Sequence, residues 1–539
     1  MDANLGAPGR HTILNRLRYL SSRLPWLVSV GVLSVLPVVV VSALVTFYLK
    51  SNLQDYFPVG GDSATYWQEI ANFAKVGFHS GHSGFEETAA PAAKLGIGTF
   101  GSHSQWFPML YGCIAKMIGW GPATVSFINI VLVSLSLGAM AWLMKGTIRF
   151  NLFCAVFLAT SLYILTFLPI MMMEALQYCI SFILAGLFYR RLTLSRKAPS
   201  WLGPCLWGTI MLAALTRYSW GILFFAYYMP VSRLRSGNAW LACLAKGLCF
   251  TVLGFSLYTY FAAPYPYEPF PGSVFGIKVY VSMLHGDVGP FLTLFKTNIL
   301  GVFHPGRVTV QLVLFWIIIF YFIAAPILSL FERDDSLASD SRSGLALAIF
   351  HCINLGGILA AVTLYYYTTL GMVGLRQSMP QFACTFLVLA RSIRIRWLIP
   401  VLVFQVVSIP SSIITFMDNM EAEYNSYQQN IARHETGKLF KLIKYNKNAL
   451  SPWCNTVLFF GGYGFGVYML MIPPEISIND MRLPAEDELL TPLKSAWIIT
   501  DNQRASDVLK QVSGVEILGS SGVWTLYSNS NVQCHQFER

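Results

Sequence analysis

The sequence predicts a polytopic membrane protein that is almost entirely α-helical and ends in a small α/β domain. The first observation is the composition, because 55% of the residues are hydrophobic and only 12% are charged, with a mean hydropathy of +0.54. A soluble domain usually contains about 25% charged residues. The second observation is a series of long apolar runs that continues to residue 416, and the third is a change to polar sequence after it.

The N-terminal element, residues 1–24, is predicted to lie in the cytoplasm because it is basic, with Arg10, Arg16, Arg18 and Arg23. The apolar run of residues 25–49 follows directly. This run is longer than the hydrophobic region of a signal peptide and lacks a convincing small-residue cleavage site. We therefore expect a retained first membrane helix with its N-terminus inside.

The membrane domain is predicted to cover residues 25–416 and to contain about eleven helices. After the first run, the apolar runs lie near residues 123–144, 150–168, 175–190, 201–216, 218–232, 241–263, 308–331, 345–367, 372–390 and 397–416. The loops assigned to the cytoplasm are basic, apart from a mixed loop at 332–342, as the positive-inside rule requires. The opposite side receives long loops at about 50–122 and 264–307 and everything after residue 417. We expect these three segments to hold the chemistry.

The net charge of +11 does not indicate a nucleic-acid partner. The Lys and Arg residues gather in short stretches between apolar runs instead of forming one basic face, so they are interpreted as orientation signals.

The C-terminal segment, residues 417–539, is predicted to form the α/β domain. It combines helix-like stretches with strand-like runs, at 421–447, 456–460, 497–500, 506–512, 515–518 and 523–527. Cys454 and Cys534 lie in this outward segment and can pair if its compartment is oxidising. The cysteines show no CxxC spacing, so no zinc or redox motif is predicted.

The first outward loop contains an acidic residue with two interpretations. Asp62 follows a Gly pair and precedes an amphipathic stretch with Tyr66, Ile70 and Phe73 on one helical face. By residue type alone, Asp62 is a helix N-cap that stabilises by about 1 kcal/mol. The functional alternative is a general base held at the membrane surface.

Three histidines of the same loop, His79, His82 and His103, raise the question of a metal site. No acidic or Cys partner stands at a fixed offset from them, so each is expected to be a hydrogen-bonding loop residue. No metal is predicted.

Three charged residues lie at the outer ends of predicted helices: Glu174, Arg217 and Arg376. An ionisable group at the edge of the hydrocarbon region is costly unless it has a partner or a task. Outward arginines run against the positive-inside trend, and Arg binds phosphate oxygens in pairs while staying charged. The alternative is that each Arg pairs with an acidic residue such as Glu174 for structure only.

The second outward loop is rich in aromatic residues and proline, with YPYEPFPG at 265–272, and ends with His304 and Arg307. This density is typical of an interfacial belt, and a sugar-stacking groove is the rarer alternative.

Five segments, in this order and on one side of the membrane, resemble a known superfamily. They are PVGGDSATYWQEIANFAK, SHSQWFPMLYGCIAKMIG, MMMEALQYCISFILAGL, LTRYSWGILFF and GLRQSMPQFACTFLVLA. The series resembles the GT-C superfamily of polytopic glycosyltransferases that use lipid-linked sugars, in particular the branch with protein O-mannosyltransferases and the bacterial aminoarabinose transferase. The likeness covers most of residues 25–416.

This resemblance implies a GT-C-like fold and an inverting transfer of a sugar from a polyprenyl-phosphate carrier. Asp62 matches the catalytic position and would deprotonate the acceptor hydroxyl, with Asp55 as the second candidate. The outward arginines would stabilise the leaving phosphate, namely Arg217, Arg376 and Arg307. Further substrate contacts are expected from Glu174, His103, Tyr66 and His304.

The chain departs from the superfamily in two places. The loop-closing segment usually reads His-Pro-Pro, whereas here His103 is followed by Ser-Gln-Trp-Phe-Pro. The first loop also lacks the paired acidic dipeptide of metal-using members, so no cofactor and no divalent metal are predicted. The expected partners are the lipid bilayer, the polyprenyl-phosphate sugar and an acceptor that is a glycan, a lipid or a protein. The sequence indicates no oligomeric state.

Two other functions remain open. A transporter for a lipid-linked saccharide would show inverted repeats and broken helices near the midplane, and no internal repeat is found. A polysaccharide polymerase or ligase would carry its large outer loop late in the chain, whereas here the richest loop is the first. The absence of any N-x-[ST] sequon favours a bacterial inner membrane with the C-terminus in the periplasm.

Overall fold

The structure is a computed structural model. It describes residues 9–48, 61–77, 106–194, 198–229, 237–261, 285–296, 310–332, 341–364, 372–410, 413–414, 427–446, 448–449, 451–461, 472–473, 475–481, 493–532 and 534.

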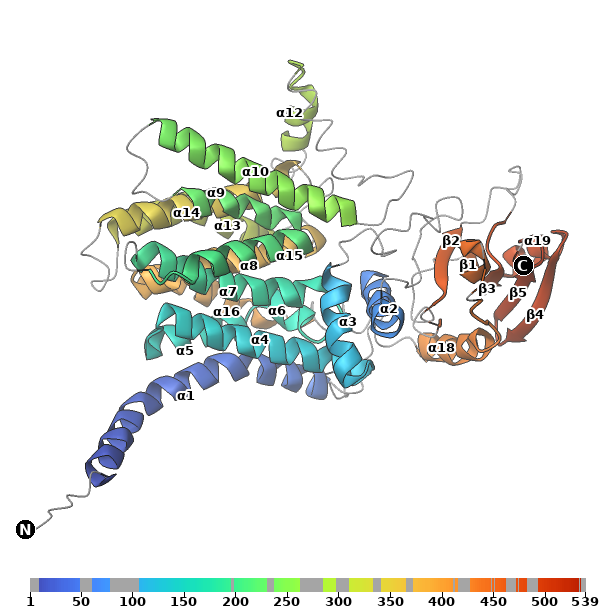
Figure 1. Ribbon diagram of the computed structural model, residues 1–539, viewed down its shortest axis with the longest axis horizontal. Coiled ribbons are helices and arrows are strands. Elements are labelled where there is room, and N and C mark those ends of the chain that lie inside the picture. Colours follow the sequence, from blue (N-terminus) through green and yellow to red (C-terminus); the bar gives the residue numbers. More distant parts are fainter. Residues whose placement is uncertain are drawn as a thin grey trace, which may run out of the picture.

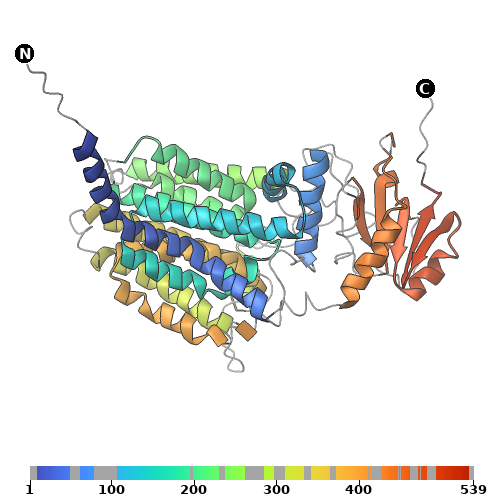
Figure 2. The ribbon, with the colours of Figure 1, turned by 90° about the horizontal axis from the view of Figure 1, so that it is seen from below.

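The described chain consists of a helical bundle and a C-terminal α/β domain (Figure 1). The bundle helices lie side by side, and α2 (Gly61–Val76) and α3 (Trp106–Ile118) lie at one end of them. The C-terminal domain lies beyond that same end in both views (Figures 1 and 2). We call this end the domain end and the opposite one the far end.

At least one helix lies within each apolar run that the sequence predicted to cross the membrane. They are α1 (Gly9–Tyr48), α4 (Pro122–Met144), α5 (Ile148–Ala159), α6 (Leu162–Phe167), α7 (Met173–Leu194), α8 (Leu202–Thr216), η3 (Tyr218–Ile222), α9 (Leu223–Tyr228), α10 (Gly237–Phe261), α13 (Val310–Phe331), α14 (Ser341–Leu364), α15 (Met372–Ser392) and α16 (Ile399–Val407).

Three described segments are long and apolar enough to cross a membrane: Arg23–Phe47, Ala123–Met144 and Asn238–Tyr258. The prediction of a membrane protein with a helical bundle is confirmed at this level. Several other helices are apolar but shorter, so the number of about eleven crossings stays a prediction.

Helix α7 is the central element of the bundle, because it packs against α4, α8 and α15. Its approach to α4 requires a glycine, since a Cβ atom on Gly186 would lie 2.9 Å from the Leu143 side chain. Small residues commonly allow such close contact between membrane helices. This packing fixes the axis of α7 and therefore the place where the helix starts.

The start of α7 is held by buried amide contacts. The Asn129 side chain of α4 donates hydrogen bonds to the carbonyls of Leu168 at 2.9 Å and Ile170 at 3.0 Å, in the segment between α6 and α7. Tyr111 of α3 donates to Asn129 Oδ1 at 2.7 Å. These bonds satisfy carbonyls that would otherwise be buried without partners, and they join α3 to the segment that precedes α7.

The C-terminal domain contains a five-stranded sheet in the order β2-β1-β3-β5-β4. The strands are β1 (Thr456–Phe460), β2 (Ser477–Met481), β3 (Trp497–Thr500), β4 (Val515–Ser521) and β5 (Trp524–Asn529). Strand β1 is parallel to β2 and β3, whereas β5 is antiparallel to β3 and β4.

Both faces of this sheet are covered by a helix. Val457 and Phe459 share a core with α18 (Tyr427–Phe440), while Leu458 and Phe460 share a second core with α19 (Gln503–Leu509). Side chains alternate between the two faces of a strand, so β1 is buried along its whole length. The predicted strand-like runs near 456–460 and 497–500 are strands, and the domain boundaries at 24 and 416 stay predictions.

Candidate functional site

Three charged side chains meet at the domain end of the bundle. Glu174 lies in the first turn of α7, Arg217 directly follows α8, and Arg376 lies near the start of α15. The Oε1 atom of Glu174 is 3.2 Å from Arg217 Nη2 and 3.5 Å from Arg376 Nε. The Glu174 side chain is only 3% exposed, whereas those of Arg217 and Arg376 are 11% and 17% exposed. We call these three residues the arginine–glutamate cluster.

Arg217 is placed by the end of its own helix. Its backbone is extended, with φ −152°, so α8 stops at Thr216 and the side chain turns toward α15. There Arg217 Nη1 donates a 2.8 Å hydrogen bond to the carbonyl of Gln377. Arg217 therefore bridges the first turns of α7 and α15.

Neutral polar side chains fasten the same helices together one turn further on. The Gln177 amide donates to Thr216 Oγ1 at 3.0 Å, and the Trp220 indole donates to Gln177 Oε1. The Gln381 amide of α15 donates to the Ser219 carbonyl at 3.1 Å. These bonds cross between α7, α15 and the turn around Arg217, so the cluster sits on a fixed frame.

Two guanidinium groups contact one carboxylate in this cluster, at a largely buried position. The second carboxylate oxygen, Glu174 Oε2, has no hydrogen-bond partner among the described residues. Guanidinium groups that keep some exposure suit an anionic group, above all a phosphate.

The alternative that each Arg pairs with an acidic residue for structure only agrees with this geometry, since both arginines contact Glu174. The two arginines share a single carboxylate oxygen of Glu174. A role in binding phosphate stays a prediction.

The other predicted site residues divide into two groups. Tyr66 lies in α2, is 3% exposed, and packs its ring edge-on against Phe107 of α3 with a centroid distance of 4.9 Å. Asp62 belongs to the first turn of α2, but its side chain lies outside the described residues. The remaining predicted site residues also lie outside the described residues, and their roles stay predictions: Asp55, His103, His304 and Arg307.

Sequence reasoning missed that the polar residues of α2 are buried. Gln68, Glu69 and Asn72 are each at most 2% exposed. The Gln68 amide donates to the Ile472 carbonyl at 3.3 Å, and Lys75 Nζ lies 3.2 Å from Glu475 Oε1. The C-terminal domain thus contacts the helix that carries Asp62. No local pattern could show this, because the partners are 404 and 400 residues apart.

No group of three or more His, Cys, Asp or Glu side chains that could hold a metal ion occurs within the described ranges. His79, His82 and His103 lie outside these ranges, so the prediction of no metal site remains a prediction.

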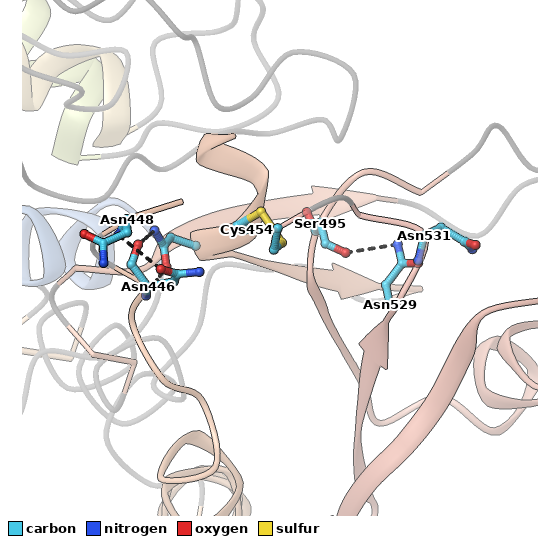
Figure 3. The surroundings of a disulfide bond; sticks show 8 residues. Asn446, Asn448, Cys454, Ser495, Asn529 and Asn531 are labelled. Carbon is cyan, nitrogen blue, oxygen red and sulfur yellow. Dashed lines mark hydrogen bonds between the residues drawn. A yellow bond between two sulfur atoms is a disulfide. The ribbon is translucent and has the colours of Figure 1, made fainter. Parts of the chain in front are cut away.

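The pairing of Cys454 and Cys534 is confirmed, since these residues form a disulfide with Cα atoms 5.5 Å apart (Figure 3). The bond closes a loop of 80 residues. Beside it lies an open depression lined in part by Lys444, Tyr445 and Trp497.

These features define the class of the molecule: an integral membrane protein with a charged cluster at one end of its helical bundle and a small C-terminal α/β domain beyond that end. The sequence matches no protein-family model and no curated protein sequence. Among solved structures, the chain is similar to the crystal structure of ArnT from Cupriavidus metallidurans bound to undecaprenyl phosphate. The sequence identity is 9% and the TM-score is 0.39, over 94% of this chain and 98% of that chain. A likeness at this TM-score assigns neither a fold family nor an activity.

Proposed function

We propose that this protein is a GT-C-like membrane glycosyltransferase that moves a sugar from a polyprenyl-phosphate carrier to an acceptor at the domain end. The observation that carries the proposal is the convergence of the partly exposed Arg217 and Arg376 on the buried Glu174 at the domain end of an apolar bundle. The hydrocarbon chain of a lipid phosphate would lie in the bilayer, and its phosphate group would lie at the domain end of the bundle. The cluster would supply the positive charge that such a group requires.

The orientation of the site is inferred from the two ends of the bundle. The far end is basic, with Arg191 in the last turn of α7 and Arg391 in the last turn of α15, as expected for a cytoplasmic face. The domain end carries the disulfide of the C-terminal domain, as expected for an oxidising compartment. Together with the absence of sequons, this favours a bacterial inner membrane with the site facing the periplasm.

In the proposed reaction the acceptor oxygen attacks the anomeric carbon from the side opposite the phosphate, and its proton passes to Asp62. The bond between the anomeric carbon and the phosphate oxygen breaks, and both electrons stay with the phosphate. Charge therefore grows on the phosphate in the transition state, where preformed cations stabilise it most. Arg217 and Arg376 would serve this purpose, and inversion at the anomeric carbon follows from the single displacement. The reaction as written uses no cofactor.

The position of α2 supports a role for Asp62 next to this site. Helix α2 packs on α3, and α3 is joined through Asn129 to the segment directly before α7, the helix whose first turn carries Glu174. Asp62 is in the first turn of α2, one turn before the buried Tyr66.

The test is sugar transfer from labelled polyprenyl-phosphate sugars, comparing the wild type with Asp62→Asn at matched expression. This substitution keeps the size and most of the capping ability of Asp62 while removing its basicity. We expect transfer to fall by about 100-fold or more, the contribution usual for a general base. Asp507→Asn is the matched control, since Asp507 is an exposed residue of α19 in the C-terminal domain. Equal transfer by both variants would remove Asp62 from the reaction.

A further inference from the structure

One carboxylate oxygen of the arginine–glutamate cluster and three hydroxyl oxygens near it are buried without a hydrogen-bond partner in the described part of the chain. They are Glu174 Oε2, Tyr178 Oη, Tyr163 Oη and Thr166 Oγ1. Their residues are between 1% and 3% exposed. A buried polar atom without a partner is costly, and native structures contain few of them. Four in one region therefore require an explanation.

The four atoms come from two adjacent helices. Glu174 and Tyr178 are one turn apart on the same face of α7, and Tyr163 and Thr166 are neighbours on α6, which packs against α7. Tyr178 lies near Tyr163, Glu174 and Arg217. Phe167, which follows Thr166, places its ring centroid 5.9 Å from Arg376 Cζ. The hydroxyl groups of Tyr163, Thr166 and Tyr178, called here the hydroxyl cluster, thus lie on the two helices beside the arginines.

The chemistry of these atoms restricts what can bind them. A bare phosphate presents only acceptor oxygens, which Glu174 Oε2 would repel. A metal ion prefers several anionic or imidazole ligands, and the described residues contain no such group. A polyol can donate hydrogen bonds to the carboxylate oxygen and can both donate to and accept from the tyrosine hydroxyls. A saccharide with free hydroxyl groups satisfies all four atoms.

We propose that Glu174 Oε2 and the hydroxyl cluster bind the hydroxyl groups of the donor sugar, while Arg217 and Arg376 hold its phosphate. This inference rests on the proposed function and names the substrate class of the same site, a saccharide with free hydroxyl groups on a lipid phosphate. One helical turn of about 5.4 Å separates Glu174 from Tyr178. A phosphate and the sugar bonded to it can bridge that spacing. Tyr163, Thr166 and Tyr178 are thereby specificity-determining residues.

The first measurement is thermal unfolding of the ligand-free protein. Removing a hydroxyl that has no protein partner should not lower the melting temperature, so Tyr163→Phe and Tyr178→Phe should melt at or above the wild type. Tyr111→Phe is the matched control, because the Tyr111 hydroxyl is fully buried and donates a 2.7 Å hydrogen bond to Asn129. That variant should melt below the wild type, since Asn129 loses a partner.

The second measurement is binding by the full chain in lipid nanodiscs. The probes are undecaprenyl phosphate alone and the same lipid phosphate linked to a hexose, a pentose or an N-acetylhexosamine. We expect the wild type to bind at least one sugar-linked form more tightly than the bare phosphate. Tyr163→Phe and Tyr178→Phe should each reduce that preference about three- to tenfold, the worth of one neutral hydrogen bond, and leave the affinity for the bare phosphate unchanged.

Two results would overturn this inference. One is a sugar preference that both tyrosine variants retain in full, which would mean that the hydroxyl cluster holds water only. The other is an equal loss of affinity for the bare and the sugar-linked lipid phosphate. A wild type that binds no lipid phosphate of any kind would instead overturn the proposed function, and with it the inference that rests on it.

Discussion

Arg217 Nη2 lies 3.2 Å from Glu174 Oε1, although the two residues are 43 positions apart, one in the first turn of α7 and the other directly after α8. The same oxygen is 3.5 Å from Arg376 Nε. Two partly exposed guanidinium groups therefore converge on one buried carboxylate oxygen at the domain end of the bundle. This convergence is the reason for assigning the arginines to a phosphate, and the assignment can be tested without knowing the sugar.

Glu174→Gln separates the structural role from the binding role. The substitution removes the carboxylate that both arginines contact, and we expect the free energy of unfolding to fall by roughly 2 kcal/mol, less than for a fully buried pair because both arginines keep some exposure. The site also loses one negative charge, so the affinity for undecaprenyl phosphate alone should rise. Thermal unfolding and lipid binding of the same preparation measure the two effects.

The control for this variant is Glu475→Gln, which breaks the ion pair with the 58% exposed Lys75. An exposed pair contributes about 0–1 kcal/mol, so stability should hardly change and lipid binding not at all. If Glu174→Gln lowers stability while the affinity for undecaprenyl phosphate stays at the wild-type value, the cluster is a structural feature and not a phosphate site.

Arg217→Lys keeps the positive charge but loses the planar fork and the bond to the Gln377 carbonyl. Because charge grows on the phosphate during the reaction, we expect kcat to fall by about 10- to 1000-fold, with a smaller change in KM for the donor. Steady-state sugar transfer gives both constants. Arg396→Lys at the far end is the control, since Arg396 pairs with Glu332 and should not affect transfer. A loss confined to KM would indicate ground-state binding only.

The disulfide leads to one prediction about the stability of the C-terminal domain and one about the compartment in which this domain lies. Replacing Cys454 and Cys534 by Ser should lower the stability of the C-terminal domain by about 2–4 kcal/mol, because the bond closes a loop of 80 residues. In intact cells, an impermeant maleimide should label these cysteines only after reduction. Labelling without a reductant would show free thiols and would contradict an oxidising compartment.

The contact between α2 and the C-terminal domain predicts coupling between Lys75 and Glu475, two charges that are far apart in the sequence. Lys75→Glu should reduce transfer two- to threefold by placing two carboxylates together, and Lys75→Glu with Glu475→Lys should restore it. The coupling free energy in this double-mutant cycle should be about 0.5 kcal/mol, as for other exposed pairs. Strict additivity of the two changes would show that the domain does not position α2.

The bundle could be predicted from the sequence because apolar runs and basic loops record the lipid environment directly. The break between α5 and α6 at Thr160 and Ser161 was not predicted, since both helices lie within one apolar run. Strand β2 was missed for another reason. Its sequence, SINDM, lacks an apolar alternation, and Asn479 is fully buried by tertiary contacts.

For the candidate site, sequence order was sufficient to place Glu174, Arg217 and Arg376 at one end of the bundle, because each lies where a helix begins or ends on the same side. The sequence order could not show that both arginines contact the same carboxylate oxygen of Glu174. The hydroxyl cluster gave no signal at all, since Tyr163 and Tyr178 in apolar helices are typical core residues. Only three-dimensional packing reveals that their oxygens have no partner in the described chain.

The most direct test of the central proposal is the release of undecaprenyl phosphate from sugar-linked donors by the purified chain in nanodiscs, with transferred sugar measured in the same sample. We expect one lipid phosphate to be released for each sugar transferred by the wild type, and both signals to fall together in Asp62→Asn and Arg217→Lys. If the wild type releases none from any donor in the panel, or if both variants release it at the wild-type rate, this protein does not transfer sugars through the site described here.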